Sequence, residues 1–227
     1  MTAVSDLIAV VDRLLDPDGG CVWNREQTHR TLARYAVEEA YELVDAIEDE
    51  DVGELREELG DVLYQVVLHA GIAARAGEFD LEDVAASVRD KMVRRHPHVF
   101  GDERADTVED VVRVWRAAKA AEKSSRTSAF DGVPRAMPPL ERAVKLLERL
   151  EERGSADAVV ASVVELAGAG ATPVGASGGP VATSDVAWGV SMLASVATAE
   201  RDGIDAIESL RAAVRLLETE GRAAAEA

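Results

Sequence analysis

Hydrophobic residues recur at every third or fourth position along most of this chain, and that spacing is typical of amphipathic helices. In the first half of the chain the pattern predicts helices over about residues 7–15, 28–48, 52–77, 81–95 and 108–123. In the second half it predicts further helices over about residues 140–153, 186–199 and 204–220. Turn-forming residues separate these stretches, so we expect an all-α protein.

The predicted helices 28–48 and 52–77 should form an antiparallel hairpin, because only the short acidic turn from Asp49 to Asp51 joins them. Both helices carry apolar stripes, and the stripe of the second runs from Leu55 to Ala70. A two-helix hairpin cannot cover so broad an apolar surface by itself. We therefore expect at least a homodimer.

The chain divides at a proline-rich connection that runs from Phe130 to Pro139. Beyond it, 184–191 repeats the pattern of 60–67, and the small-residue stretch 167–184 predicts a loose loop. We predict three segments: a helical domain over 1–125, a linker and bridging helix over 126–155, and a degenerate helical repeat over 156–227. In that repeat the positions matching Glu38, Glu39 and Glu58 are Ala161, Ser162 and Ala182.

The amino-acid composition favours helical structure and excludes some classes of binding partner. Residues of high helix propensity dominate and aromatic residues make up only 4% of the chain. The net charge of -18 argues against nucleic acid or an anionic membrane as partner, since both need a basic surface. Cys21 is the only cysteine, and no stretch predicts a membrane span or signal peptide, so we expect a cytoplasmic protein.

Acidic residues form two clusters on the predicted hairpin, Glu38-Glu39 with Glu42, and Glu58 with Asp61. Three- and four-residue spacings place such side chains on one helix face. An isolated acidic pair is usually solvated surface. Here, however, Glu39, Glu42, Glu58 and Asp61 have no Lys or Arg four residues downstream. Carboxylates without compensating cations suit Mg²⁺ or Mn²⁺, and they do not suit Zn²⁺.

Basic and aromatic residues suggest contacts to an anionic ligand. Lys91 and Arg95 should share a face at the end of the predicted helix 81–95, which suits a triphosphate, although basic residues there could instead complement the helix C-terminus. Trp115 and Lys119 are also four residues apart, and Trp115 is either ordinary packing or an aromatic surface for a base. His96 flanks Pro97, and a structural role is favoured for it over a phosphate contact.

Together these residues resemble the MazG family of nucleoside triphosphate pyrophosphohydrolases. The family's metal motif is two adjacent glutamates, a third glutamate three residues on, and a downstream Glu-x-x-Asp. The stretches 21–29 and 94–102 carry the more specific part of the resemblance, which covers about residues 7 to 150. The chain departs from the family at Cys21-Val22-Trp23-Asn24, where Cys-Pro-Trp-Asp is usual.

The resemblance implies a MazG-like helical bundle whose four-helix core is completed by dimerisation, with residues 1–125 as the catalytic domain. It implies hydrolysis of a nucleoside triphosphate to the monophosphate and pyrophosphate by metal-activated water at the α-phosphorus. The implied Mg²⁺ ligands are Glu39, Glu42, Glu58 and Asp61, with Glu38 supporting the cluster or orienting water. So many carboxylates predict at least two Mg²⁺ ions per site, and Mn²⁺ could replace Mg²⁺ there. The implied substrate contacts are Lys91, Arg95, Trp115, Trp23 and Lys119.

Two alternatives stay open on the sequence alone. One is a narrower pyrophosphohydrolase for deoxynucleotides or damaged bases, because base preference depends on pocket shape. The other is a non-catalytic nucleotide- or partner-binding protein that uses the metal cluster as a sensor or an assembly device. The degenerate repeat 156–227 keeps this second alternative open.

Overall fold

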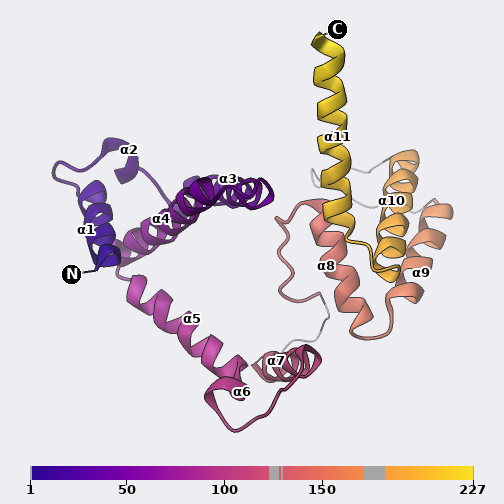
Figure 1. Ribbon diagram of the computed structural model, residues 1–227, viewed down its shortest axis with the longest axis horizontal. Helices are drawn as coiled ribbons and strands as arrows, with labels where there is room; N and C mark the ends of the chain where they lie inside the picture. The colour runs from indigo at the N-terminus through magenta and orange to yellow at the C-terminus, as the bar shows by residue number, and fades with distance from the viewer. Residues whose placement is uncertain (1, 123–127, 129, 171–181, 227) are drawn as a thin grey trace. The chain divides into compact units, whose positions relative to one another are not determined.

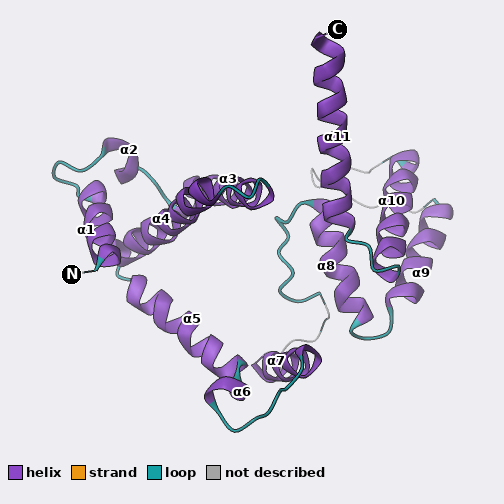
Figure 2. Cartoon of the chain, in the orientation of Figure 1, coloured by secondary structure: helices purple, strands orange, loops and turns teal. Residues whose placement is uncertain are grey.

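The computed structural model describes residues 2–122, 128, 130–170 and 182–226 (Figure 1). Every regular element in these residues is a helix (Figure 2), which confirms the predicted all-α class. Within the described residues, no helix combines the length and the apolar character needed to span a bilayer. The chain forms two compact units, Met1–Glu122 and Lys123–Ala227, which are described separately below.

Unit 1 contains seven helices among its described residues: α1 (Ala3–Leu15), α2 (Val22–Arg25), α3 (His29–Glu48), α4 (Val52–Ala76), α5 (Leu81–Arg95), α6 (Pro97–Phe100) and α7 (Val108–Glu122). The five longer helices lie where the hydrophobic period predicted them. Helices α2 and α6 were not predicted, because a helix of about one turn is too short to show a hydrophobic period.

Side-chain caps fix the ends of the α3–α4 hairpin. The Thr28 hydroxyl accepts a hydrogen bond from the backbone N–H of Thr31 and starts α3. The Asp51 carboxylate does the same for the N–H of Gly53 and starts α4. At the far end, Gly77 adopts a φ of 71°, which suits glycine and ends the helix. Because only a short turn joins the two helices, they pack along each other as an antiparallel pair (Figure 1).

The core of unit 1 lies where α1 and α3 cover the second half of α4. Its most buried members form one cluster: Val11, Leu15, Leu32, Val67 and Leu68. Gly71 allows α1 to approach closely, since a Cβ there would lie 2.9 Å from the Leu15 Cδ1 atom. The packing of α1 fixes the second half of α4 and leaves the acidic first half of that helix beside α3.

Helices α5, α6 and α7 form the remaining part of unit 1. Helix α5 packs against α4 and contacts both α6 and α7. Within the described residues, α7 packs against α5 and α6 and against neither α3 nor α4. Figure 1 shows α5 leading away from the hairpin, with α7 at its far end. Residues of α7 are therefore separated from the acidic part of the hairpin within one chain.

Unit 2 is a cluster of four described helices, α8 (Pro139–Glu151), α9 (Ala156–Gly168), α10 (Thr183–Arg201) and α11 (Ala206–Glu226). Helices α9 and α10 pack along each other, α8 contacts both, and α11 contacts α8 and α10. The predicted loop 167–184 has helical residues at both ends, and residues 171–181 lie outside the described residues. Helix α8 packs within unit 2, and the division of the chain at residues 126–155 stays a prediction.

Candidate metal centre

Three carboxylates from the two helices of the hairpin converge in unit 1. Glu39 lies near the middle of α3, and Glu58 and Asp61 lie in the first half of α4. One carboxylate oxygen from each lies within 4.8 Å of the others. The convergence follows from the antiparallel pairing, which brings the middle of α3 beside the early turns of α4.

The negative charges of this cluster are poorly compensated by the protein. Burial is the main cause that raises the pKa of Glu39, followed by the charges of Asp61 and Glu42. The pKa of Glu58 is also raised, first by burial and then by Asp61 and Glu39. The Oε2 atom of Glu58 is enclosed and has no hydrogen-bond partner among the described residues. A divalent cation at this position would compensate all three carboxylates.

Gln65 also contacts the acidic cluster, although it was not predicted from the sequence. Its Nε2 donates a hydrogen bond of 3.1 Å to Oε1 of Glu39, and this contact lowers the pKa of Glu39 against the effect of burial. The side chain of Gln65 is buried, and its own Oε1 has no partner among the described residues. Its position four residues after Asp61, on the same helix face, was the signal that could have found it.

The other two predicted acids lie at the edge of the cluster. Glu42 is exposed and close enough to Glu39 for its charge to raise the pKa of that residue. Glu38 is exposed and outside the group of converging oxygens. Three of the four predicted ligands are therefore close together in the structure, and the role of Glu42 stays a prediction. An all-oxygen donor set fits a hard cation such as Mg²⁺.

The predicted phosphate-binding residues lie on α5 and α7. Arg95 is buried, and its Nε and Nη2 donate to Oε2 of Glu122 at 3.0 and 2.7 Å. Its guanidinium also lies over the ring of Trp115, as does the ammonium of Lys119. Glu122 was not predicted from the sequence, and its pKa is lowered chiefly by the hydrogen bond from Arg95. The predicted contacts Arg95, Trp115 and Lys119 thus form one cluster.

This basic cluster is not brought to the acids within one chain, because α7 contacts neither α3 nor α4 among the described residues. Lys91 lies one turn before Arg95 on α5 and is half-buried. It makes no hydrogen bond or ion pair within the part of the chain that the structure describes. His96 bonds to the Met92 carbonyl through Nδ1 at 2.7 Å, and its structural role stays a prediction.

Trp23 and its neighbour Asn24 lie in α2, in the segment where the sequence departs from the family. Trp23 is 47% exposed and packs edge-on against Tyr35, with ring centroids 5.7 Å apart. Asn24 is buried and accepts a hydrogen bond of 3.3 Å from the Tyr64 hydroxyl. The asparagine therefore anchors α2 to α4, and the Trp23 side chain stays partly exposed.

Comparison with known proteins places these residues in a family. Residues 27–100 match the model of the MazG nucleotide pyrophosphohydrolase domain, and this segment holds all the converging acids. The chain is also 43% identical over 221 residues to a 26.1 kDa protein in the blaB 3′ region of Streptomyces cacaoi. The aligned region covers 96% of this chain and 81% of that protein. The chain belongs to the MazG family. The resemblance inferred from the sequence is thereby confirmed.

Two further proteins are similar to parts of this chain. The nucleoside triphosphate pyrophosphohydrolase of Escherichia coli strain K12 is 44% identical over 156 residues, or 68% of this chain and 59% of that enzyme. The chain thus spans about three fifths of the length of this curated relative. A solved mazG-related protein from Thermotoga maritima is 30% identical, covers 51% of this chain and 97% of its own, and has a TM-score of 0.44.

Proposed function

We propose that this MazG-family protein hydrolyses nucleoside triphosphates to the nucleoside monophosphate and pyrophosphate, with Mg²⁺ as cofactor. The observation that carries the proposal is the convergence of Glu39, Glu58 and Asp61 inside the segment that matches the family domain. The name of the Escherichia coli relative, a nucleoside triphosphate pyrophosphohydrolase, supports the same reaction. A role in clearing nucleotide pools is consistent with this activity.

The acids of the hairpin are suited to hold the metal. Glu39, Glu58 and Asp61, with Glu42 beside them, would bind at least two Mg²⁺ ions, which Mn²⁺ could replace. When bound, the metal would neutralise charge on the phosphates and supply a water of lowered pKa for attack at the α-phosphorus. Gln65 would hold the Glu39 carboxylate in one orientation through its hydrogen bond.

Residues of α5 and α7 are suited to bind the phosphates and the base. Lys91 has no ion-pair partner among the described residues, so its ammonium is available for a phosphate. The guanidinium of Arg95 would have to exchange or share its contact with Glu122 to do the same. Trp115 and Trp23 offer aromatic surfaces for the base, and Lys119 lies beside the first of them.

A homodimer would cover the apolar face of the hairpin. On α4, Leu59, Leu63 and Val66 lie on one face and are 53%, 39% and 40% exposed. On α3, Val37 and Tyr41 are 54% and 43% exposed. Exposed apolar residues grouped at helical spacing are typical of an interface. A second chain could also bring its own basic cluster toward the acids of the first.

The dimer is tested by light scattering at micromolar concentration. The protein should have at least twice its monomer mass, and Leu63→Glu should shift it toward the monomer because a charge would enter the apolar interface. Val10→Glu, which adds the same charge at an exposed position on α1 and outside this face, is the matched control. A monomeric wild-type protein would contradict the proposal.

Unit 2 is proposed to be a scaffold without a metal site. Among the described residues, Glu165 and Asp185 belong to no group of side chains able to share an ion. Anomalous diffraction with Mn²⁺ should therefore find metal at the acids of unit 1. Ordered Mn²⁺ at Asp185 would reject the scaffold role.

The reaction is tested with ATP and its deoxy form in ¹⁸O-labelled water. Attack at the α-phosphorus should place the label in the monophosphate and leave pyrophosphate as the second product. Label in orthophosphate would reject the reaction, and the absence of any phosphate release would favour a non-catalytic role. Glu58→Gln should abolish turnover while the helical content stays unchanged. Glu57→Gln, a change of the exposed neighbour, should retain turnover.

A further inference from the structure

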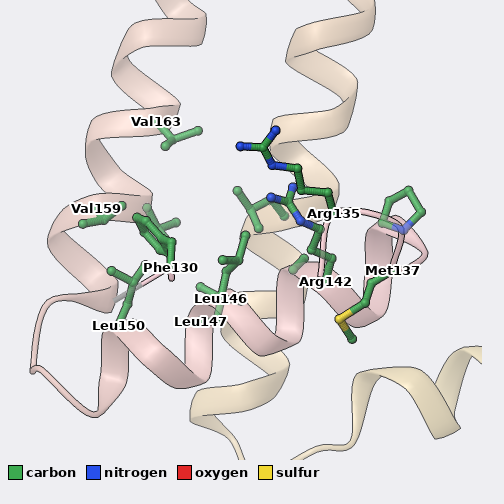
Figure 3. Close-up of a pocket in the computed structure, with 13 residues that line it drawn as sticks. Phe130, Arg135, Met137, Arg142, Leu146, Leu147, Leu150, Val159 and Val163 are labelled. Carbon is green, nitrogen blue, oxygen red and sulfur yellow. The ribbon is translucent and has the colours of Figure 1, made fainter. Parts of the chain in front are cut away.

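Unit 2 contains a cavity of about 460 Å³ that the proposed reaction does not use (Figure 3). Its walls are mainly apolar side chains from α8, α9 and the segment that precedes α8. They include Phe130, Leu146, Leu150, Val159 and Val163. The volume lies within the range of roughly 300–1,000 Å³ that is typical of small-molecule sites. The cavity is therefore large enough for a ligand.

Two arginines supply the charge of this cavity. Arg135 and Arg142 are the only charged residues among the described residues that line it, and no Asp or Glu does so. Figure 3 shows both guanidinium groups directed into the space between α8 and α9. Neither side chain makes an ion pair or hydrogen bond within the described residues, and the Nε of Arg142 is enclosed without a partner.

This arrangement is unusual in a chain with a net charge of -18, where acids are available to pair with surface arginines. Two uncompensated guanidinium groups near each other repel, and a partly enclosed cation without a partner is unfavourable. A bound anion would remove both penalties. Because arginine binds planar carboxylates through two parallel hydrogen bonds, a carboxylate is a suitable anion.

We propose that this cavity binds a small amphipathic carboxylate, with the apolar body among the Leu and Val side chains and the carboxylate on Arg135 and Arg142. The remaining lining residues, such as Met137 and Pro139, offer apolar surface. A nucleotide fits poorly, since the polar edges of its base and its sugar hydroxyls would lose water without gaining partners. The site is thus distinct from the proposed triphosphate site in unit 1.

The proposal is tested with decanoate as probe and the full chain. Calorimetry should give saturable binding at one site per chain, and the NMR signal of the Met137 methyl group should shift with the same affinity. Methyl decanoate, which lacks the charge, should bind at least about tenfold more weakly, because the charge-assisted hydrogen bonds are lost. Equal binding of the ester would overturn the proposal.

Variants of the two arginines test whether their side chains contact decanoate. Arg142→Gln should weaken decanoate binding at least about tenfold, and Arg135→Gln, a change of an exposed residue, gives a second test if the first variant does not fold. Arg153→Gln, an exposed change just beyond α8 and outside the cavity, should bind as the wild type does. Unchanged binding in both cavity variants, or displacement of decanoate by ATP, would overturn the assignment.

Discussion

The hydrogen bond from Gln65 to Glu39 allows a test that separates stability from metal binding. The buried amide of Gln65 has two opposing effects on the fold. Its Nε2 donates to the Glu39 carboxylate at 3.1 Å, which is favourable, and its Oε1 is enclosed without a partner among the described residues, which is unfavourable. The replacement Gln65→Leu removes both groups and retains a side chain of similar size.

The two effects should nearly cancel in the free energy of unfolding. Losing a hydrogen bond to a charged acceptor costs about 1.5–3 kcal/mol, and removing a buried oxygen without a partner returns about 1–3 kcal/mol. Because the leucine also remains in an apolar environment, the net change should be no more than about 1–2 kcal/mol. The metal-free variant should therefore remain folded.

Metal affinity should respond much more strongly. Without the amide, the Glu39 carboxylate loses the contact that fixes its orientation and lowers its pKa. Loss of such an outer contact typically weakens metal binding about 10–100-fold. Calorimetry with Mn²⁺ measures the affinity, and urea unfolding without metal measures the stability. Tyr64→Phe is the control, since the Tyr64 hydroxyl bonds Asn24 outside the acidic cluster.

If Gln65→Leu bound Mn²⁺ as tightly as the wild type, the hydrogen bond from Gln65 would have no role in metal binding. If the variant lost more than about 3 kcal/mol of stability, the enclosed oxygen of Gln65 would have a stabilising contact, and the two effects would not cancel.

Two further predictions concern the packing of unit 1. Gly71→Ala should lower the melting temperature, because the new Cβ would lie 2.9 Å from Leu15 Cδ1 and overpacking of about 1–3 kcal/mol exceeds the gain of about 1 kcal/mol in helix propensity. In Gly60→Ala, on the same helix, the new Cβ would have no neighbour within 4 Å among the described residues, so this change should raise the melting temperature. The second prediction concerns the stacked pair His29 and His69, whose Nδ1 atoms lie 2.8 Å apart. Burial first, and then His29, lower the pKa of His69 below 6.5. The unfolded chain therefore binds the proton first, so stability should fall as the pH drops below about 6.5 and continue to fall until the folded pKa is reached. His69→Gln should reduce this slope in denaturant titrations at several pH values, and an unchanged slope would contradict the assignment.

The helices of unit 1 could be predicted because their signals are local. The hydrophobic period gives the long helices, and the residues Thr28, Asp51 and Gly77 mark the ends of the hairpin in the sequence. The acidic cluster follows from the same local information. Once α3 and α4 are joined by a short turn, the positions of Glu39, Glu58 and Asp61 along the helices determine that they meet.

The contacts of Arg95 could not be predicted in this way. Its position on a basic face of α5 indicates a cation that is available to an anion, and the spacing to Lys91 supports that interpretation. In the structure, Glu122 bonds its guanidinium from 27 residues away, across the packing of α5 and α7. That pairing depends on how two helices cross after a loop, and neither residue carries a local signal for it.

The acids of the hairpin lie together within one chain, whereas the basic residues of α5 and α7 lie apart from them, and this separation affects how a triphosphate can bind. The acids meet within one hairpin, so the proposed metal centre depends only on the fold of unit 1. The basic residues lie on α5 and α7, where α7 has no contact with the hairpin among the described residues, and Arg95 already holds a carboxylate. If triphosphate binding needs both sets, it must bring a second chain or a movement of α5 and α7, and it must compete with Glu122. On this argument, Glu122→Gln should lower the KM for ATP while leaving Mn²⁺ affinity in the absence of nucleotide unchanged. A raised KM would instead show that Glu122 holds Arg95 in the orientation that the phosphates require.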